Sequence, residues 1–171
     1  MAGFAYARLM DENRTEDDTE AGADWVLSWT PASLEVPVGI NHGASALCRV
    51  ASGDLVVISE NGGASWDLPG GRPRGDESLR QTLDRGLWDE ARARASQATL
   101  LGYARSACLA GPHQGLVLVR SLWLADVALE AWEVGLEEAN RLVVLPVEAL
   151  ALMPEGMRDF YSEIFEAAGL V

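Results

Sequence analysis

Hydrophobic and polar residues follow a strand-like pattern over most of this chain, interrupted by one clear helical stretch near its middle. The apolar runs at residues 44–50 and 55–59 flank Ala51-Ser52-Gly53-Asp54, which predicts a β-hairpin because small and polar residues favour a turn. A glycine-containing loop at residues 111–115 separates two longer apolar stretches. Further strands are expected at about residues 25–29, 66–68, 99–109, 116–125 and 142–145.

The helical stretch covers about residues 78–94. Ser78 followed by Gln81 fits a capping box, in which the two side chains satisfy free backbone N–H groups at the start of a helix. The apolar residues recur every four positions and would form one buried stripe, made of Leu79, Leu83, Leu87 and Ala91.

Two more helices are expected in the C-terminal region. Pro146 can open a short helix through Leu152, since a proline in the first turn removes no hydrogen bond. An apolar face recurs over about residues 155–168, and Gly169 is typical of a helix end. The order of strands and helices predicts an α/β layered domain.

Composition and charge narrow the functional classes. The 171 residues suffice for one domain with a sizeable core, and the net charge of -13 disfavours general nucleic-acid binding. Residues 11–20 are acidic and lack apolar side chains, which predicts a solvated linker. Residues 1–42 are therefore expected to form an N-terminal extension that contains this linker and a possible strand. The main domain would cover residues 43–171. No apolar run is long enough to span a membrane and no signal-like segment opens the chain, so a cytoplasmic location is expected.

The types of reactive residue exclude several kinds of chemistry. All basic residues are arginine, which excludes a lysine Schiff base and a P-loop lysine. Cys48 and Cys108 lie in apolar segments and are expected to be small buried hydrophobic residues. The sequence has no Gly-x-Ser-x-Gly elbow and no zinc-ligand spacing.

Two adjacent carboxylates follow a glycine-rich loop. Asp89 and Glu90 would share a helix face with position 86, because residues three and four apart are neighbours on a helix. The loop at residues 70–75 can present backbone groups to a ligand. Mg²⁺ takes such oxygen ligands, often together with substrate phosphates. On its own, the arrangement is more typical of an ordinary solvated helix face.

The spacing of these residues resembles the Nudix box. That motif has a glycine, then after five residues a glutamate, and after seven more Arg-Glu-aliphatic-x-Glu-Glu-x-Gly-aliphatic. The matching positions are Gly71, Glu77, Arg85, Leu87 and Glu90, with Asp89 replacing a glutamate. The resemblance covers roughly residues 43–168 and implies a Nudix-like α/β/α sandwich with a mixed sheet.

Two positions depart from the motif. Gly86 stands where the family has the first glutamate of its Arg-Glu pair, and Arg92 stands where it has a glycine. Glycine inside a helix costs about 1 kcal/mol relative to alanine. Either a ligand or neighbouring group needs the space at position 86, or the position has drifted after a loss of activity. If the box geometry is intact, Gly86→Glu should tighten metal binding.

The resemblance implies a role for each matching position. Mg²⁺ (or Mn²⁺) would be held by the Gly71 carbonyl, Asp89 and Glu90, with Glu138 as an additional acid from a later loop. The general base stays open among Glu90, Glu137 and Glu138. Glu77 and Arg85 are expected to organise the metal cluster. Arg72 and Arg74 are expected to meet the phosphates of the substrate.

The resemblance implies hydrolysis of a diphosphate bond in a nucleoside diphosphate linked to another moiety. A metal-assisted in-line attack by water is the expected reaction, weakened by the missing acid at Gly86. The alternative is a non-catalytic Nudix-like module that binds a nucleotide or a protein partner. The expected partner is a small phosphorylated ligand, not a membrane or general nucleic acid. Substrate identity and homodimer formation stay open.

Overall fold

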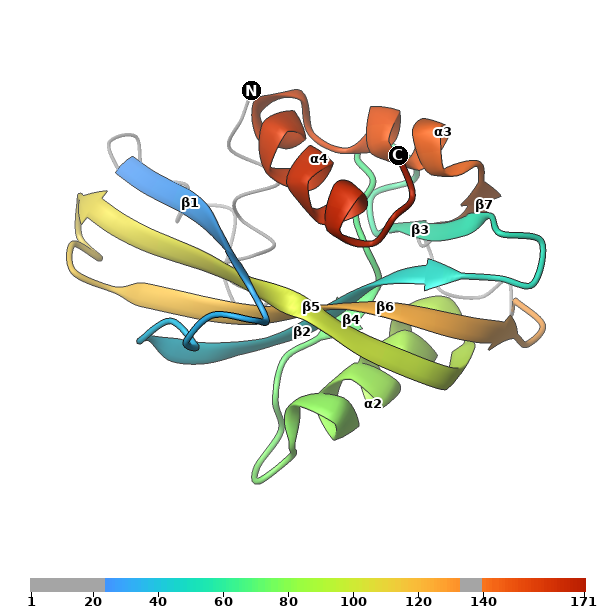
Figure 1. Ribbon diagram of the computed structural model, residues 1–171, viewed down its shortest axis with the longest axis horizontal. Coiled ribbons are helices and arrows are strands. Elements are labelled where there is room, and N and C mark those ends of the chain that lie inside the picture. Colours follow the sequence, from blue (N-terminus) through green and yellow to red (C-terminus); the bar gives the residue numbers. More distant parts are fainter. Residues whose placement is uncertain (1–23, 133–139) are drawn as a thin grey trace.

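The computed structural model describes residues 24–132 and 140–171 (Figure 1). The predicted acidic linker at residues 11–20 and the acids Glu137 and Glu138 lie outside these ranges.

Strands of the described chain form one mixed sheet. They are β1 (Asp24–Pro31), β2 (Ile40–Arg49), β3 (Leu55–Ser59), β4 (Gly70–Gly71), β5 (Ala93–Ala110), β6 (Val117–Leu129) and β7 (Asn140–Val144). Their order is β1-β5-β6-β2-β3-β7, and the short β4 pairs with β2. The β2–β6 pair is parallel, while the other named pairs are antiparallel. The predicted hairpin is confirmed as β2 and β3, and the strand predicted near residues 25–29 joins the same sheet through β5.

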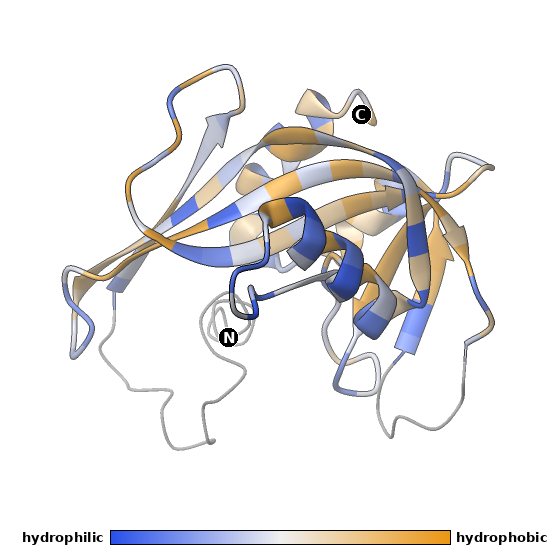
Figure 2. Cartoon of the chain, turned by 90° about the horizontal axis from the view of Figure 1, so that it is seen from below, coloured by the Kyte–Doolittle hydropathy of each residue, from blue (hydrophilic) through white to orange (hydrophobic). Residues whose placement is uncertain are grey.

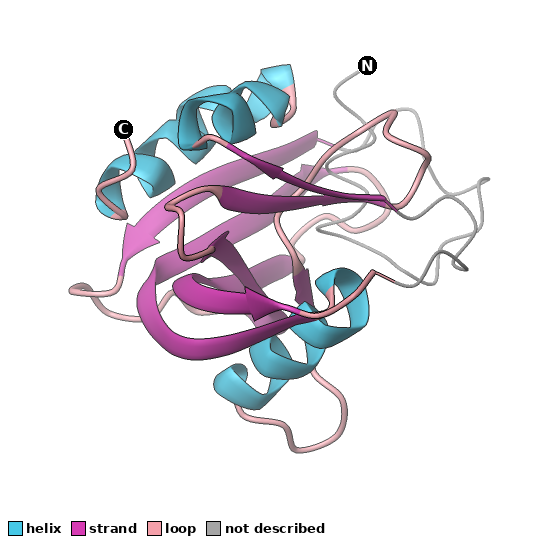
Figure 3. Ribbon diagram, turned by 90° about the vertical axis from the view of Figure 1, so that its right-hand side faces the viewer, coloured by secondary structure: helices cyan, strands magenta, loops and turns pink. Residues whose placement is uncertain are grey.

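Helices cover both faces of this sheet (Figures 1 and 3). α2 (Leu79–Ala91) lies on one side, and α3 (Pro146–Leu152) with α4 (Arg158–Ala167) lies on the other. A short 3₁₀ turn (Glu155–Met157) precedes α4. This arrangement confirms the predicted α/β/α sandwich, including the short helix that begins at Pro146. Within the described residues, none of the helices has the length and apolar character needed to cross a membrane.

The sheet divides the core into two halves. Leu83 and Leu87 of α2 are fully buried against one face of the sheet. Ile164 and Phe165 of α4 are fully buried against the other face. Each buried leucine-sized side chain contributes about 1.5–3 kcal/mol, so both helices are firmly attached. Figure 2, drawn from the α2 side, shows hydrophilic residues between the apolar positions of this helix.

The two ends of α2 differ in how well the sequence predicts them. At its start the capping box is present: the backbone N–H of Gln81 donates to Ser78 Oγ at 3.2 Å, and the backbone N–H of Ser78 donates to Gln81 Oε1 at 2.9 Å. The predicted end at residue 94 is wrong, because the helix ends at Ala91. Arg92 adopts a left-handed conformation with φ 49° and ψ 41°, and Ala93 then begins β5. This is the position at which the Nudix box has glycine, the residue that adopts that conformation most readily.

Candidate functional site

An ion pair between Glu77 and Arg85 holds the loop before α2 against the helix. Arg85 Nε donates to Glu77 Oε1 at 2.7 Å, and Arg85 Nη2 donates to Glu77 Oε2 at 2.9 Å, which is a bidentate arrangement. Arg85 Nη2 also donates to the carbonyl oxygen of Arg72, and the backbone N–H of Arg74 donates to Glu77 Oε2 at 3.0 Å. Hydrogen bonding from Arg85 lowers the pKa of Glu77 to about 2. The loop is therefore fixed to the helix at two points.

Position 86 of α2 has no room for a side chain. A Cβ atom on Gly86 would lie 2.4 Å from the carbonyl carbon and oxygen of Gly70, and 2.5 Å from the nitrogen of Gly71. Behind this contact, a Cβ on Gly70 would lie 2.2 Å from the carbonyl oxygen of Ala44 in β2. These neighbours are backbone atoms and cannot rotate aside. The tighter metal binding expected of Gly86→Glu stays a prediction that depends on an intact box geometry, and a glutamate at this position would first have to push β4 away from the helix.

A cleft of about 270 Å³ opens beside the contact between α2 and β4. It is bounded by the end of β3, by β4 and the loop that follows, and by one face of α2. Its charged residues are three arginines and three acids, namely Arg72, Arg74, Arg85, Glu60, Asp89 and Glu90. Because the whole chain has 13 basic residues against 26 acidic ones, this balance makes the cleft much less negative than the chain as a whole.

The two adjacent carboxylates of α2 have different surroundings. Asp89 Oδ2 lies 3.6 Å from Arg74 Nη2 and 3.4 Å from Arg85 Nη1. Glu90 Oε2 accepts the backbone N–H of Gly70 at 2.8 Å. Asp89 therefore neutralises part of the arginine charge, whereas Glu90 helps to hold α2 on β4.

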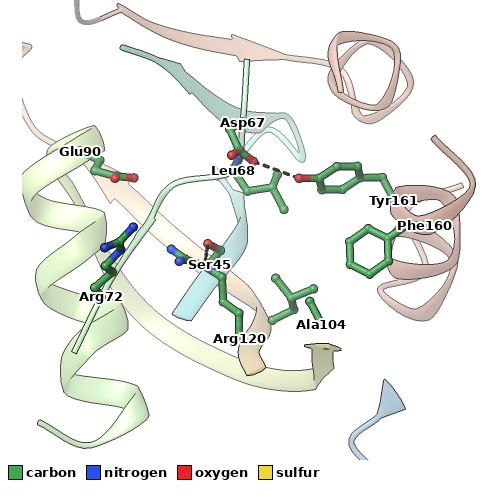
Figure 4. Close-up of a pocket in the computed structure, with 10 residues that line it drawn as sticks. Ser45, Asp67, Leu68, Arg72, Glu90, Ala104, Arg120, Phe160 and Tyr161 are labelled. Atoms are coloured by element: carbon green, nitrogen blue, oxygen red, sulfur yellow. Dashed lines mark hydrogen bonds between the residues drawn. The ribbon is translucent and has the colours of Figure 1, made fainter. Parts of the chain in front are cut away.

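A second cavity, of about 20 Å³, adjoins the cleft on the α4 side and shares Arg72 and Glu90 with it (Figure 4). On one wall, Arg120 of β6 donates from Nε to Ser45 Oγ at 2.7 Å. On another, Tyr161 Oη of α4 donates to Asp67 Oδ1 at 3.1 Å.

Sequence reasoning named Arg72 and Glu90 but missed four other polar residues of this second cavity, namely Ser45, Asp67, Arg120 and Tyr161. Arg120 could have been found, because it is a charged residue inside the apolar run at residues 116–125. Asp67 gave no comparable indication, since an acid before Leu68-Pro69-Gly70 is typical of an ordinary turn. Cys48 and Cys108 are both buried, as predicted.

Comparison with solved structures identifies this architecture. The Bacillus subtilis pyrophosphohydrolase BsRppH matches with a TM-score of 0.60 at 17% identity, over 86% of this chain and 90% of that chain. The MutT protein from Methanosarcina mazei Go1 matches with a TM-score of 0.55 at 20% identity, over 76% and 94% of the two chains. A MutT protein from Bacillus halodurans gives 0.57 at 16% identity, over 70% and 78%. These are Nudix hydrolases.

The chain has a Nudix-like fold. No family model and no curated protein matches the sequence. At such identities the likeness concerns the fold alone, because one fold hosts many functions.

The described residues do not fit the divalent cation that Nudix enzymes generally use. Within residues 24–132 and 140–171, no group of three or more His, Cys, Asp or Glu side chains is placed to hold a metal ion. Asp89 faces two guanidinium groups, and the carbonyl group nearest to a Cβ atom on Gly86 belongs to Gly70, one residue before the predicted Gly71. Glu138 lies outside the described residues, so its part in a metal site stays a prediction.

Proposed function

We propose that this Nudix-like protein binds the diphosphate group of a nucleotide derivative in the cleft beside α2, without hydrolysing it. One observation carries the proposal: Gly86 packs on the backbone of β4, which removes a carboxylate from the cleft and leaves its three arginines. A cleft with fewer acids attracts a divalent cation less and a phosphate more.

Each arginine of the cleft has a distinct place. Arg74 has a side chain that is 70% exposed and can turn toward a ligand. Arg85 is held by Glu77, and Arg72 lines both the cleft and the smaller cavity. Guanidinium groups match phosphate oxygens with two parallel hydrogen bonds. The structural likeness to a pyrophosphohydrolase supports a diphosphate as the ligand, by analogy of fold.

The test is isothermal titration calorimetry of the full chain with ADP and with inorganic pyrophosphate. Arg74→Gln should weaken binding about tenfold or more, because a charge-assisted hydrogen bond is lost. Arg80→Gln is the matched control, since Arg80 pairs with Asp84 on α2 and does not line the cleft. Equal affinities for the two variants, or no binding by the wild type, would contradict the proposal.

A second candidate is metal-dependent hydrolysis of a diphosphate bond, as in Nudix hydrolases. Two observations favour it: the Glu77–Arg85 pair braces the loop, and Glu90 lies against Gly70. It would require a further ligand from outside the described residues, such as Glu138. Turnover of nucleoside triphosphates, nucleotide sugars or ADP-ribose with Mg²⁺ or Mn²⁺, abolished by Glu90→Gln, would establish this candidate over simple binding.

A further inference from the structure

Asp89 lies where the side chains of two cleft arginines meet. Its Oδ2 atom is 3.6 Å from Arg74 Nη2 and 3.4 Å from Arg85 Nη1. Both distances exceed the roughly 2.7–2.9 Å of a strong charge-assisted hydrogen bond. The Asp89 and Arg74 side chains are also 42% and 70% exposed. An exposed pair with long contacts is weakly held, so another anion can replace its carboxylate at small cost.

The arginines are anchored independently of Asp89. Arg85 is 21% exposed and bonds to both carboxylate oxygens of Glu77 and to the Arg72 carbonyl. The backbone of Arg74 is fixed by its N–H bond to Glu77. When Asp89 turns away, the Arg85 guanidinium stays in the cleft. The Arg74 side chain then still extends from a backbone held in the same position.

The charges around Asp89 would repel a bound cation and attract a bound anion. A divalent cation bound to Asp89 would lie close to two guanidinium groups of like charge, and position 86 has no space for a carboxylate to offset them. A phosphate that took the place of the Asp89 carboxylate would face both positive groups instead.

We infer that Asp89 is an internal competitor of the ligand: its carboxylate pairs with Arg74 and Arg85, and a phosphate displaces it without the help of a divalent cation. This inference rests on the proposed function and specifies how the same cleft selects its ligand. The ligand must carry more negative charge than one carboxylate, which favours a diphosphate over a carboxylate or a singly charged phosphodiester.

The experiment compares Asp89→Asn with the wild type by calorimetric titration of inorganic pyrophosphate, once in EDTA and once in Mg²⁺. Asparagine keeps the size of the side chain and removes its charge. Binding in EDTA should become about two- to five-fold tighter, the range that corresponds to loss of a weak surface ion pair. Asp84→Asn is the control, because Asp84 is an exposed acid of α2 that pairs with Arg80 outside the cleft. Its affinity should equal that of the wild type.

The outcomes separate this inference from the proposed function. Unchanged or weaker binding by Asp89→Asn in EDTA would overturn the inference while leaving binding itself intact. Binding that requires Mg²⁺ in the wild type and disappears in Asp89→Asn would overturn it in favour of a metal ligand. Absence of pyrophosphate binding by the wild type under both conditions would instead contradict the proposed function. A thermal unfolding curve for each variant confirms that it is folded.

Discussion

Replacing Gly86 with alanine tests the contact that shapes the cleft. At an exposed helix position, alanine stabilises by about 1 kcal/mol relative to glycine. At position 86 the added methyl group would lie 2.4–2.5 Å from three backbone atoms of β4. Inserting a methyl group into a packed site costs about 1–3 kcal/mol, and contacts this short with backbone place the cost at the upper end. The net expectation is a loss of about 2 kcal/mol in the free energy of unfolding.

Urea unfolding followed by tryptophan fluorescence measures this change. Position 84, exposed on the same helix, supplies the reference through the difference between Asp84→Ala and Asp84→Gly. At position 84 alanine should be the more stable of the two, whereas at position 86 glycine should be. If alanine in place of glycine raises the free energy of unfolding by the same amount at position 86 as at position 84, then α2 and β4 are not in close contact. The explanation of the missing glutamate is then refuted.

Three further predictions concern the residues that brace the site. The pKa of Glu77 is lowered to about 2, below its unfolded value of about 4.3, so its stabilising effect is complete at neutral pH and is lost as the pH falls toward 2. The stability gap between wild type and Glu77→Gln should therefore shrink over that range in urea titrations; a constant gap would refute the pairing. Tyr161→Phe removes a hydrogen bond to Asp67 and should cost about 1.5–3 kcal/mol in the free energy of unfolding; an unchanged urea midpoint would contradict this. Arg85→Lys cannot keep the bidentate bond to Glu77 and should weaken pyrophosphate binding; full retention in calorimetry would argue against that brace.

Local rules predicted the start of α2 but not its end. The capping box is encoded by two residues three positions apart, so the sequence alone shows where the helix begins. The end depends on Arg92, which takes a left-handed conformation that few side chains adopt. The strands β5 and β6 follow directly and are longer than predicted, because pairing along a hairpin extends beyond the apolar residues.

The candidate site depends on contacts between segments distant in the sequence. Spacing on a helix correctly grouped position 86 with Asp89 and Glu90, all of which line one cleft. The reason for glycine at position 86 lies in β4, whose approach to α2 is set by the whole sheet. Likewise, the pairing of Asp89 with Arg74 depends on the path of a loop that no periodic pattern specifies.

The most direct test of arginine-based diphosphate binding follows the arginine Nε–Hε resonances by NMR while pyrophosphate is added in EDTA. The account predicts saturable shifts for Arg74 and Arg85 and none for Arg49 or Arg158, which do not line the cleft. The absence of shifts at Arg74 and Arg85 in EDTA, or their appearance only after Mg²⁺ is added, would contradict it.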